Sequence, residues 1–117
     1  MPFMLLSSEG DRICIQAIGR ITASHAYGED DTLFSLTGPS GYAGKTLLSL
    51  QRVEFIDSAG IGWLLANHKR FKQAGGMLVL HSVPESILLT LKLLRLNAIF
   101  EIAEDEDQAM EMVNGGQ

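Results

Sequence analysis

The sequence contains a single cysteine, Cys14, so no disulfide can form within the chain. Cys14 lies in the run Arg12-Ile13-Cys14-Ile15-Gln16-Ala17-Ile18, which predicts a strand. A cysteine there is expected to pack as a small buried hydrophobe rather than to act as a reactive thiol. Lysine and arginine are not clustered as they are on nucleic-acid-binding surfaces, and the net charge is −5. We therefore expect no binding to DNA or RNA.

Long apolar runs are also missing. None approaches the roughly 20 residues that cross a bilayer, and Met1 to Ser7 carries no basic segment before a sustained apolar run, so no signal peptide is predicted. We expect a cytoplasmic protein without membrane insertion. The 117 residues, of which 46% are hydrophobic and 20% charged, suit one globular domain over 1–117.

The chain alternates strand-like and helix-like segments after residue 46. This alternation predicts β-α-β crossovers and parallel pairing, whereas the segment from Met4 to Ile18, with a turn at Glu9-Gly10-Asp11, predicts an antiparallel hairpin. The fold class expected is therefore α/β, a mixed sheet of about four to five strands with helices packed mainly on one face. The expected strands are 4–6, 12–18, 46–50, 77–82 and 99–102, and the expected helices are 29–36, 58–74, 84–95 and 104–113.

Two segments carry more specific expectations. Leu47 to Leu50 is continuously apolar, as is Met77 to Leu80, so we expect both strands to lie side by side in the centre of the sheet. Residues 38–44 are rich in glycine and other turn residues, and we expect this loop to be the most mobile internal segment.

The expected third helix, after Pro84, has more apolar residues than one buried face needs. Ile87, Leu88, Leu91 and Leu94 form one stripe, and Leu89, Leu93 and Leu96 form a second. Two interpretations stay open. The helix is buried on two sides, or it exposes an apolar strip to a partner or to a second copy in a homodimer.

The segment Asp57-Ser58-Ala59-Gly60-Ile61-Gly62 marks the start of the main helix. Asp57 or Ser58 can cap that helix through a side-chain oxygen, and we expect Ser58 to be solvent-accessible. The buried stripe is expected at Ile61, Leu64, Leu65, His68 and Phe71 or Lys72. Trp63 falls off this stripe beside Ala59, Asn67 and Arg70, where it is either an ordinary exposed aromatic or an anchor for a partner.

The residues that enzymes need are not in place. The sequence has no phosphate-binding Gly-x-x-x-x-Gly-Lys-Ser/Thr loop and no Gly-x-Ser-x-Gly motif, and Asp57 is expected to be a turn and capping residue rather than a base. The histidines His25, His68 and His81 lie in different elements without ligand spacing. We therefore expect no catalytic residues, no metal and no cofactor.

The motif at 57–62 resembles the STAS domain family, which includes bacterial anti-sigma factor antagonists and typically has Asp-Ser-Ser-Gly-Leu-Gly at this place. The resemblance extends to Val53-Glu54-Phe55-Ile56 before the motif, to Gly75-Gly76 before the next strand, to Pro84 and to Gly19-Arg20-Ile21. Three residues depart from the family pattern: Thr22 stands where Asp is common, Ala59 replaces the second serine, and Arg95 stands where Gly often ends the third helix.

The resemblance implies a function. In the family, the first serine of the motif, here Ser58, is phosphorylated by a partner kinase that is also an anti-sigma factor, and a separate serine phosphatase reverses the modification. It implies a partner-binding surface that we expect to comprise Thr22, Asp57, Ser58, Ala59, Gly60, Trp63 and Asn67. Two alternatives stay open: an accessory subunit of a lipid or solute transporter, and a scaffold subunit of a signalling assembly.

Overall fold

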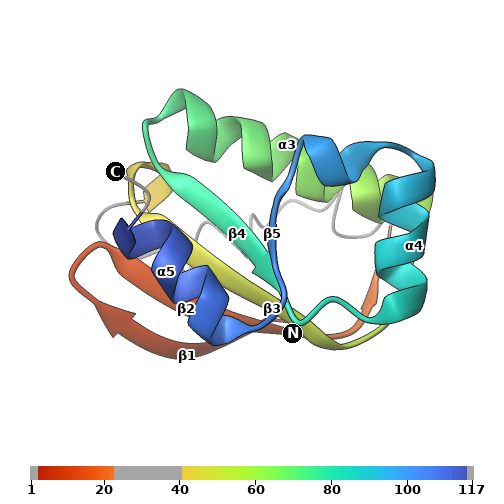
Figure 1. Cartoon of the computed structure of the whole chain (residues 1–117), viewed down its shortest axis with the longest axis horizontal. Helices are drawn as coiled ribbons and strands as arrows, with labels where there is room; N and C mark the ends of the chain where they lie inside the picture. The colour runs from red at the N-terminus through yellow and green to blue at the C-terminus, as the bar shows by residue number, and fades with distance from the viewer. Residues whose placement is uncertain (1–2, 23–40, 116–117) are drawn as a thin grey trace.

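The computed structural model describes residues 3–22 and 41–115, and Figure 1 shows the arrangement of their helices and strands. The elements are β1 Phe3–Glu9, β2 Arg12–Ile21, η1 Gly41–Ala43, β3 Lys45–Ile56, α3 Ser58–Gln73, β4 Met77–His81, α4 Glu85–Leu93, η2 Leu96–Ala98, β5 Glu101–Ala103 and α5 Glu106–Gly115.

Within the described residues, five strands form one mixed sheet in the order β1-β2-β3-β4-β5. β1 and β2 form the expected antiparallel hairpin, and the later strands pair in parallel. β3 is the central strand, and Leu47 and Leu48 lie beside Val79 and Leu80 of β4. The predicted fold class and the predicted central pair of strands are therefore confirmed.

The two faces of the sheet bury different residues. Ile13, Ile15 and Ala17 of β2 join the larger core, to which α3 and α4 contribute. Cys14 points to the opposite face, where it packs with Leu47, Val79 and α5. Two of the three described helices thus cover one face and α5 covers the other (Figure 1). Cys14 is 2% exposed, as expected for a small buried hydrophobe.

β3 is longer than the expected strand at 46–50, because it continues from the apolar run through Ile56. The pairing of β2 with β3 shifts register between Gln16 and Ile18 and again between Gly19 and Arg20, each time with one extra residue on β3, and it continues to Ile21 and Ile56. β4 pairs with β3 only as far as Ser49. The second half of β3 therefore extends beyond β4 and carries the start of α3 away from it.

The segment after α4 differs from the prediction. The helix ends at Leu93 rather than at Arg95, because Arg95 adopts a left-handed backbone with φ 60°. A short 3-10 turn follows, in which the N–H groups of Ile99 and Phe100 both donate to the Leu96 carbonyl. These hydrogen bonds use the N–H groups of Ile99 and Phe100, which were expected to start the last strand. β5 therefore begins only at Glu101.

The last helix also begins later than predicted, at Glu106 instead of residue 104. The Asp105 side chain accepts a hydrogen bond from the Gln108 N–H at 2.9 Å, and its carbonyl accepts from Ala109. Asp105 thus takes the capping position. Ala109 and Val113 are buried in the core on this face of the sheet, and Met110 is partly buried.

The expected helix at 29–36 and residues 38–40 of the expected mobile loop lie outside the described residues. The end of that loop is the 3-10 turn η1. Its Tyr42 ring meets Phe71 edge to face at 4.9 Å, and its hydroxyl donates to Asn67 at 3.2 Å. The mobility of 38–44 stays a prediction.

Candidate functional site

The start of α3 lies at the end of the sheet where β2 and β3 stop together. Ile21 pairs with Ile56, and the Asp57 N–H donates to the Ile21 carbonyl at 3.3 Å. Thr22 follows directly after Ile21 and is partly buried. The fold therefore brings Thr22 to the same end of the sheet as the Asp57–Gly60 motif, as the sequence predicts.

Asp57 caps the helix. Its backbone is extended, with φ −95° and ψ 179°, and its Oδ1 accepts a hydrogen bond from the Gly60 N–H at 2.7 Å. The Asp57 carbonyl accepts from Ile61 at 2.9 Å. Of the two candidate caps, Asp57 fills the position, and Ser58 is the first helical residue.

Ser58 is exposed at the helix N-terminus, as predicted. Its hydroxyl makes no hydrogen bond with any residue in the described part of the chain. Backbone N–H groups in the first turn of a helix concentrate positive potential there. An exposed hydroxyl that the cap does not use therefore lies at the end of α3 that best tolerates a negative charge.

Gly60 is required by close packing. A Cβ atom at this position would overlap the Ile21 carbonyl oxygen. The main chain of α3 thus approaches the end of β2 directly, which fixes the helix start against the sheet. Gly62, in contrast, is exposed, and a Cβ there would meet nothing within 4 Å.

The expectation that Trp63 stands exposed is wrong. Trp63 is 8% exposed and stacks on the Phe3 ring with centroids 5.2 Å apart. Asn67 is fully buried, where it donates to the Trp63 carbonyl at 2.9 Å and accepts from the Tyr42 hydroxyl. Both belong to the interior, because α3 is covered on a second flank by Phe3 of β1 and Tyr42 of η1.

Sequence reasoning did not identify Phe55 and Arg20 as neighbours of the motif. Phe55 is 42% exposed, and the Arg20 Cζ atom lies 4.6 Å from the centre of its ring. The two residues are paired across β2 and β3, next to Ile21 and Ile56. In the sequence, the alternation of Glu54, Phe55 and Ile56 was the signal that could have identified Phe55. An exposed aromatic and a cation therefore lie at the same sheet end as Ser58.

The described histidines do not form a catalytic or metal site with Ser58. Burial and the nearby Lys72 ammonium lower the pKa of His68, and burial lowers the pKa of His81. His81 Nδ1 lies 3.0 Å from Ser82 Oγ. No group of three or more potential metal ligands is found over 3–22 and 41–115, and no helix in those ranges could span a membrane. His25 lies outside the described residues.

Comparisons with known proteins match this architecture. The STAS domain model matches residues 9–109. A candidate anti-sigma factor antagonist of Thermotoga maritima, TM1081, superimposes with a TM-score of 0.81 at 26% identity over 95% of this chain and 93% of that one.

Two further solved structures share the fold at lower identity. SpoIIAA of Bacillus, an anti-sigma factor antagonist, gives a TM-score of 0.64 at 16% identity over 97% of this chain and 98% of its own. A sulfate transporter family protein of Wolinella succinogenes gives 0.71 at 15% identity over 92% and 88%. With a family match over 9–109 and the expected sheet, this chain belongs to the STAS domain family.

Proposed function

We propose that this STAS domain is a regulatory binding protein of the anti-sigma factor antagonist type, in which Ser58 is a phosphorylation switch. The unmodified protein binds an anti-sigma factor that is also a serine kinase, and phosphorylation of Ser58 releases it. A serine phosphatase restores the binding form. These events belong to the cytoplasm, and this chain acts in them as kinase substrate and ligand rather than as an enzyme.

The proposal rests on the different roles of Asp57 and Ser58 at the helix start. Asp57 holds the cap through Gly60, so the exposed Ser58 hydroxyl is not needed for helix stability. A phosphate on Ser58 would bring a charge of about −1.5 to −2 to the positive end of α3. The fold tolerates this charge, but a surface shaped for a neutral hydroxyl does not.

The proposed partner surface surrounds Ser58 on the exposed part of the sheet end. It comprises Thr22, Asp57 and Ala59 from the expected set, and Phe55 with Arg20 as additions from the same end of the sheet. Gly60, also in the expected set, is buried against Ile21 and positions the helix start instead of contacting a partner. Trp63 and Asn67 support this surface from the interior and are not available for contact. The likeness to TM1081 extends over nearly the whole of both chains, which supports the antagonist role over other roles for this fold.

The test compares Ser58 variants by calorimetric titration against the isolated partner kinase. We expect Ser58→Ala to bind like wild type and to resist phosphorylation. We expect Ser58→Asp to bind about a hundredfold more weakly, because its carboxylate must be desolvated at the interface without a partner. Ser8→Asp is the control, since Ser8 is exposed in β1 and pairs with Ile13, at the opposite end of β2 from Ile21, and its affinity should equal that of wild type.

Equal affinities for wild type and Ser58→Asp would end the phospho-switch proposal. The fold also occurs in a sulfate transporter family protein, at an identity that concerns the fold alone. Co-purification of this chain with transporter subunits, without binding to any kinase, would favour the accessory-subunit alternative. A stable assembly that is insensitive to both Ser58 variants would favour the scaffold role.

A further inference from the structure

A second candidate site lies at the opposite end of α3 from Ser58. A cavity of about 420 Å³ opens where α3 ends, where β4 begins and where the C-terminal half of α5 passes. This volume is within the range of small-molecule pockets. Its α3 residues His68 and Lys72 lie roughly 15 and 21 Å from Ser58 along the helix, so it is distinct from the proposed partner surface.

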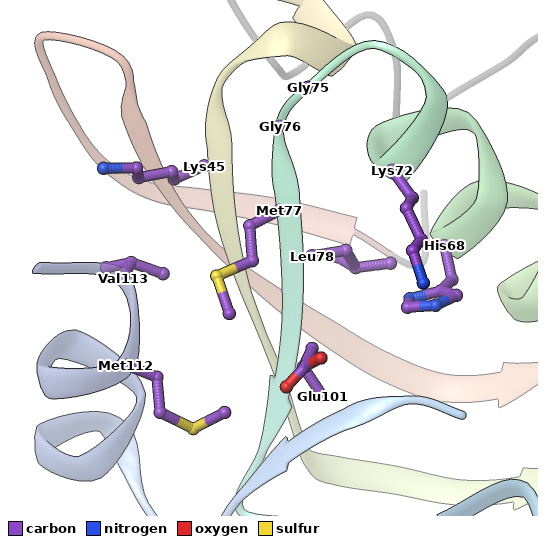
Figure 2. A pocket seen from close by; sticks show the side chains of 10 residues that line it. All are labelled: Lys45, His68, Lys72, Gly75, Gly76, Met77, Leu78, Glu101, Met112 and Val113. Carbon is purple, nitrogen blue, oxygen red and sulfur yellow. The ribbon is translucent and has the colours of Figure 1, made fainter. Parts of the chain in front are cut away.

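The cavity is lined from both sides of β4, with Lys45 on the methionine side and Leu78 on the His68 side (Figure 2). Figure 2 shows Met77 of β4 and Met112 of α5 with their thioether groups on one side of β4, and His68 and Lys72 of α3 on the other, with Glu101 of β5 below them. Methionine side chains adapt to the shape of apolar ligands. The methionine side therefore suits a flexible hydrocarbon group, and the His68 side suits a charged head.

The charges around the cavity leave a positive excess. Lys45 and Lys72 contribute two ammonium groups and Glu101 one carboxylate. His68 stays neutral near pH 7, because burial and Lys72 lower its pKa while Glu101 opposes them. Lys45 lies on the methionine side of β4 and Lys72 on the opposite side (Figure 2), so one added negative charge would balance the charged groups of the cavity taken together, in a protein whose net charge is −5.

We propose that this cavity binds a small amphipathic monocarboxylate, with its hydrocarbon chain against Met77 and Met112 and its carboxylate at Lys72 beside His68. The imidazole ring is held by an edge-to-face contact with Phe100 at 5.6 Å. Its position next to the ammonium group allows it to donate a second hydrogen bond to a bound carboxylate. The proposal does not depend on the phosphorylation of Ser58.

The test uses sodium octanoate as the probe and methyl-labelled methionine as the reporter in NMR titrations of the full chain. We expect the Met77 and Met112 signals to shift, and Met4 of β1 to stay unchanged. Lys72→Gln should weaken octanoate binding roughly fivefold, the loss of one exposed charge pair. Lys69→Gln is the control, because Lys69 is an exposed lysine of the same helix that does not line the cavity.

A second readout follows the His68 ring signals with pH. The ammonium groups of Lys72 and Lys69 lower the pKa of His68. A carboxylate bound beside Lys72 offsets part of this positive charge, so octanoate should raise the pKa of His68. The proposal is overturned by absence of shifts at Met77 and Met112. It is also overturned if 1-octanol binds as tightly as octanoate, or if Lys69→Gln weakens binding as much as Lys72→Gln.

Discussion

At the scale of single residues, two glycines of α3 should respond oppositely to the same substitution. Gly60→Ala places a methyl group against the Ile21 carbonyl, so we expect a loss of roughly 1–3 kcal/mol in the free energy of unfolding. Gly62→Ala meets open space and should add up to about 1 kcal/mol, because alanine is the better helix former. Urea denaturation of both variants measures the difference. Equal effects of the two substitutions would contradict the close packing of α3 on β2.

At Arg95, too, the backbone conformation determines which side chain gives the most stable protein. Its φ of 60° lies in the left-handed region, which costs a non-glycine residue about 1–2 kcal/mol. Arg95→Gly should therefore raise the melting temperature, whereas Arg95→Ala, which keeps a Cβ atom, should not. A fall in melting temperature for Arg95→Gly would show that the arginine side chain contributes more than the backbone strain removes.

The residues of the candidate site were predictable to different degrees. Asp57 and Ser58 followed from the chemistry of helix capping, which depends on neighbours in sequence. Trp63 and Asn67 were misplaced, because their environment is set by Phe3 and Tyr42, which are distant along the chain. Helical periodicity identifies the face of α3 toward the sheet, but it gives no information about what covers the adjacent flank.

At the scale of elements, the burial of β4 beneath α5 predicts a pH dependence. His81 of β4 is 4% exposed, and burial lowers its pKa, opposed by Glu106 and Asp105. The unfolded chain therefore binds the proton more readily than the folded chain. The contribution of His81 to stability should be complete above about pH 6.5 and decrease as the pH falls toward the lowered pKa.

The variant His81→Gln isolates this effect. The variant keeps His68 and all carboxylates, so these groups contribute equally to both proteins. As the pH falls below about 6.5, the unfolding free energy of wild type should decrease relative to that of the variant. Chemical denaturation across this range measures it. A difference that is independent of pH would mean that His81 titrates alike in the folded and unfolded chain.

Element boundaries show why sequence patterns locate secondary structure better than they delimit it. The apolar run at 46–50 predicts the middle of the sheet, yet β3 continues through Arg52 and Glu54 because β2 remains paired beside it. Similarly, the apolar residues Ile99 and Phe100 resemble a strand, but their N–H groups close the turn at Leu96. In both cases hydrogen-bonding partners determine the boundary.

At the scale of the whole molecule, the exposure of the α4 side chains decides between the two interpretations of its apolar stripes. Ile87 and Leu91 are buried, whereas Leu89, Leu93 and Leu94 are 56%, 75% and 54% exposed. The helix therefore packs on one side and exposes leucine on the other. The exposed strip agrees with the interpretation that a partner or a second copy covers this face, and a homodimer through α4 stays a prediction.

Leu93→Lys separates folding from association. Since the Leu93 side chain is mostly exposed, we expect the unfolding free energy to change by less than about 0.5 kcal/mol. Sedimentation velocity of wild type and variant over a concentration series then measures self-association at constant stability. A larger loss of stability would contradict the exposed position of Leu93. A wild-type dimer that Leu93→Lys disperses would assign this face to a second copy.

The order of the strands across the sheet repeats their order along the chain. A chain leaving the ribosome can therefore build its sheet by adding each strand to the outer edge of the previous one, and no strand has to enter between two that are already paired. Until β5 arrives, the growing edge at β4 carries backbone N–H and C=O groups without strand partners. The strand order thus allows the sheet to grow in the direction of synthesis.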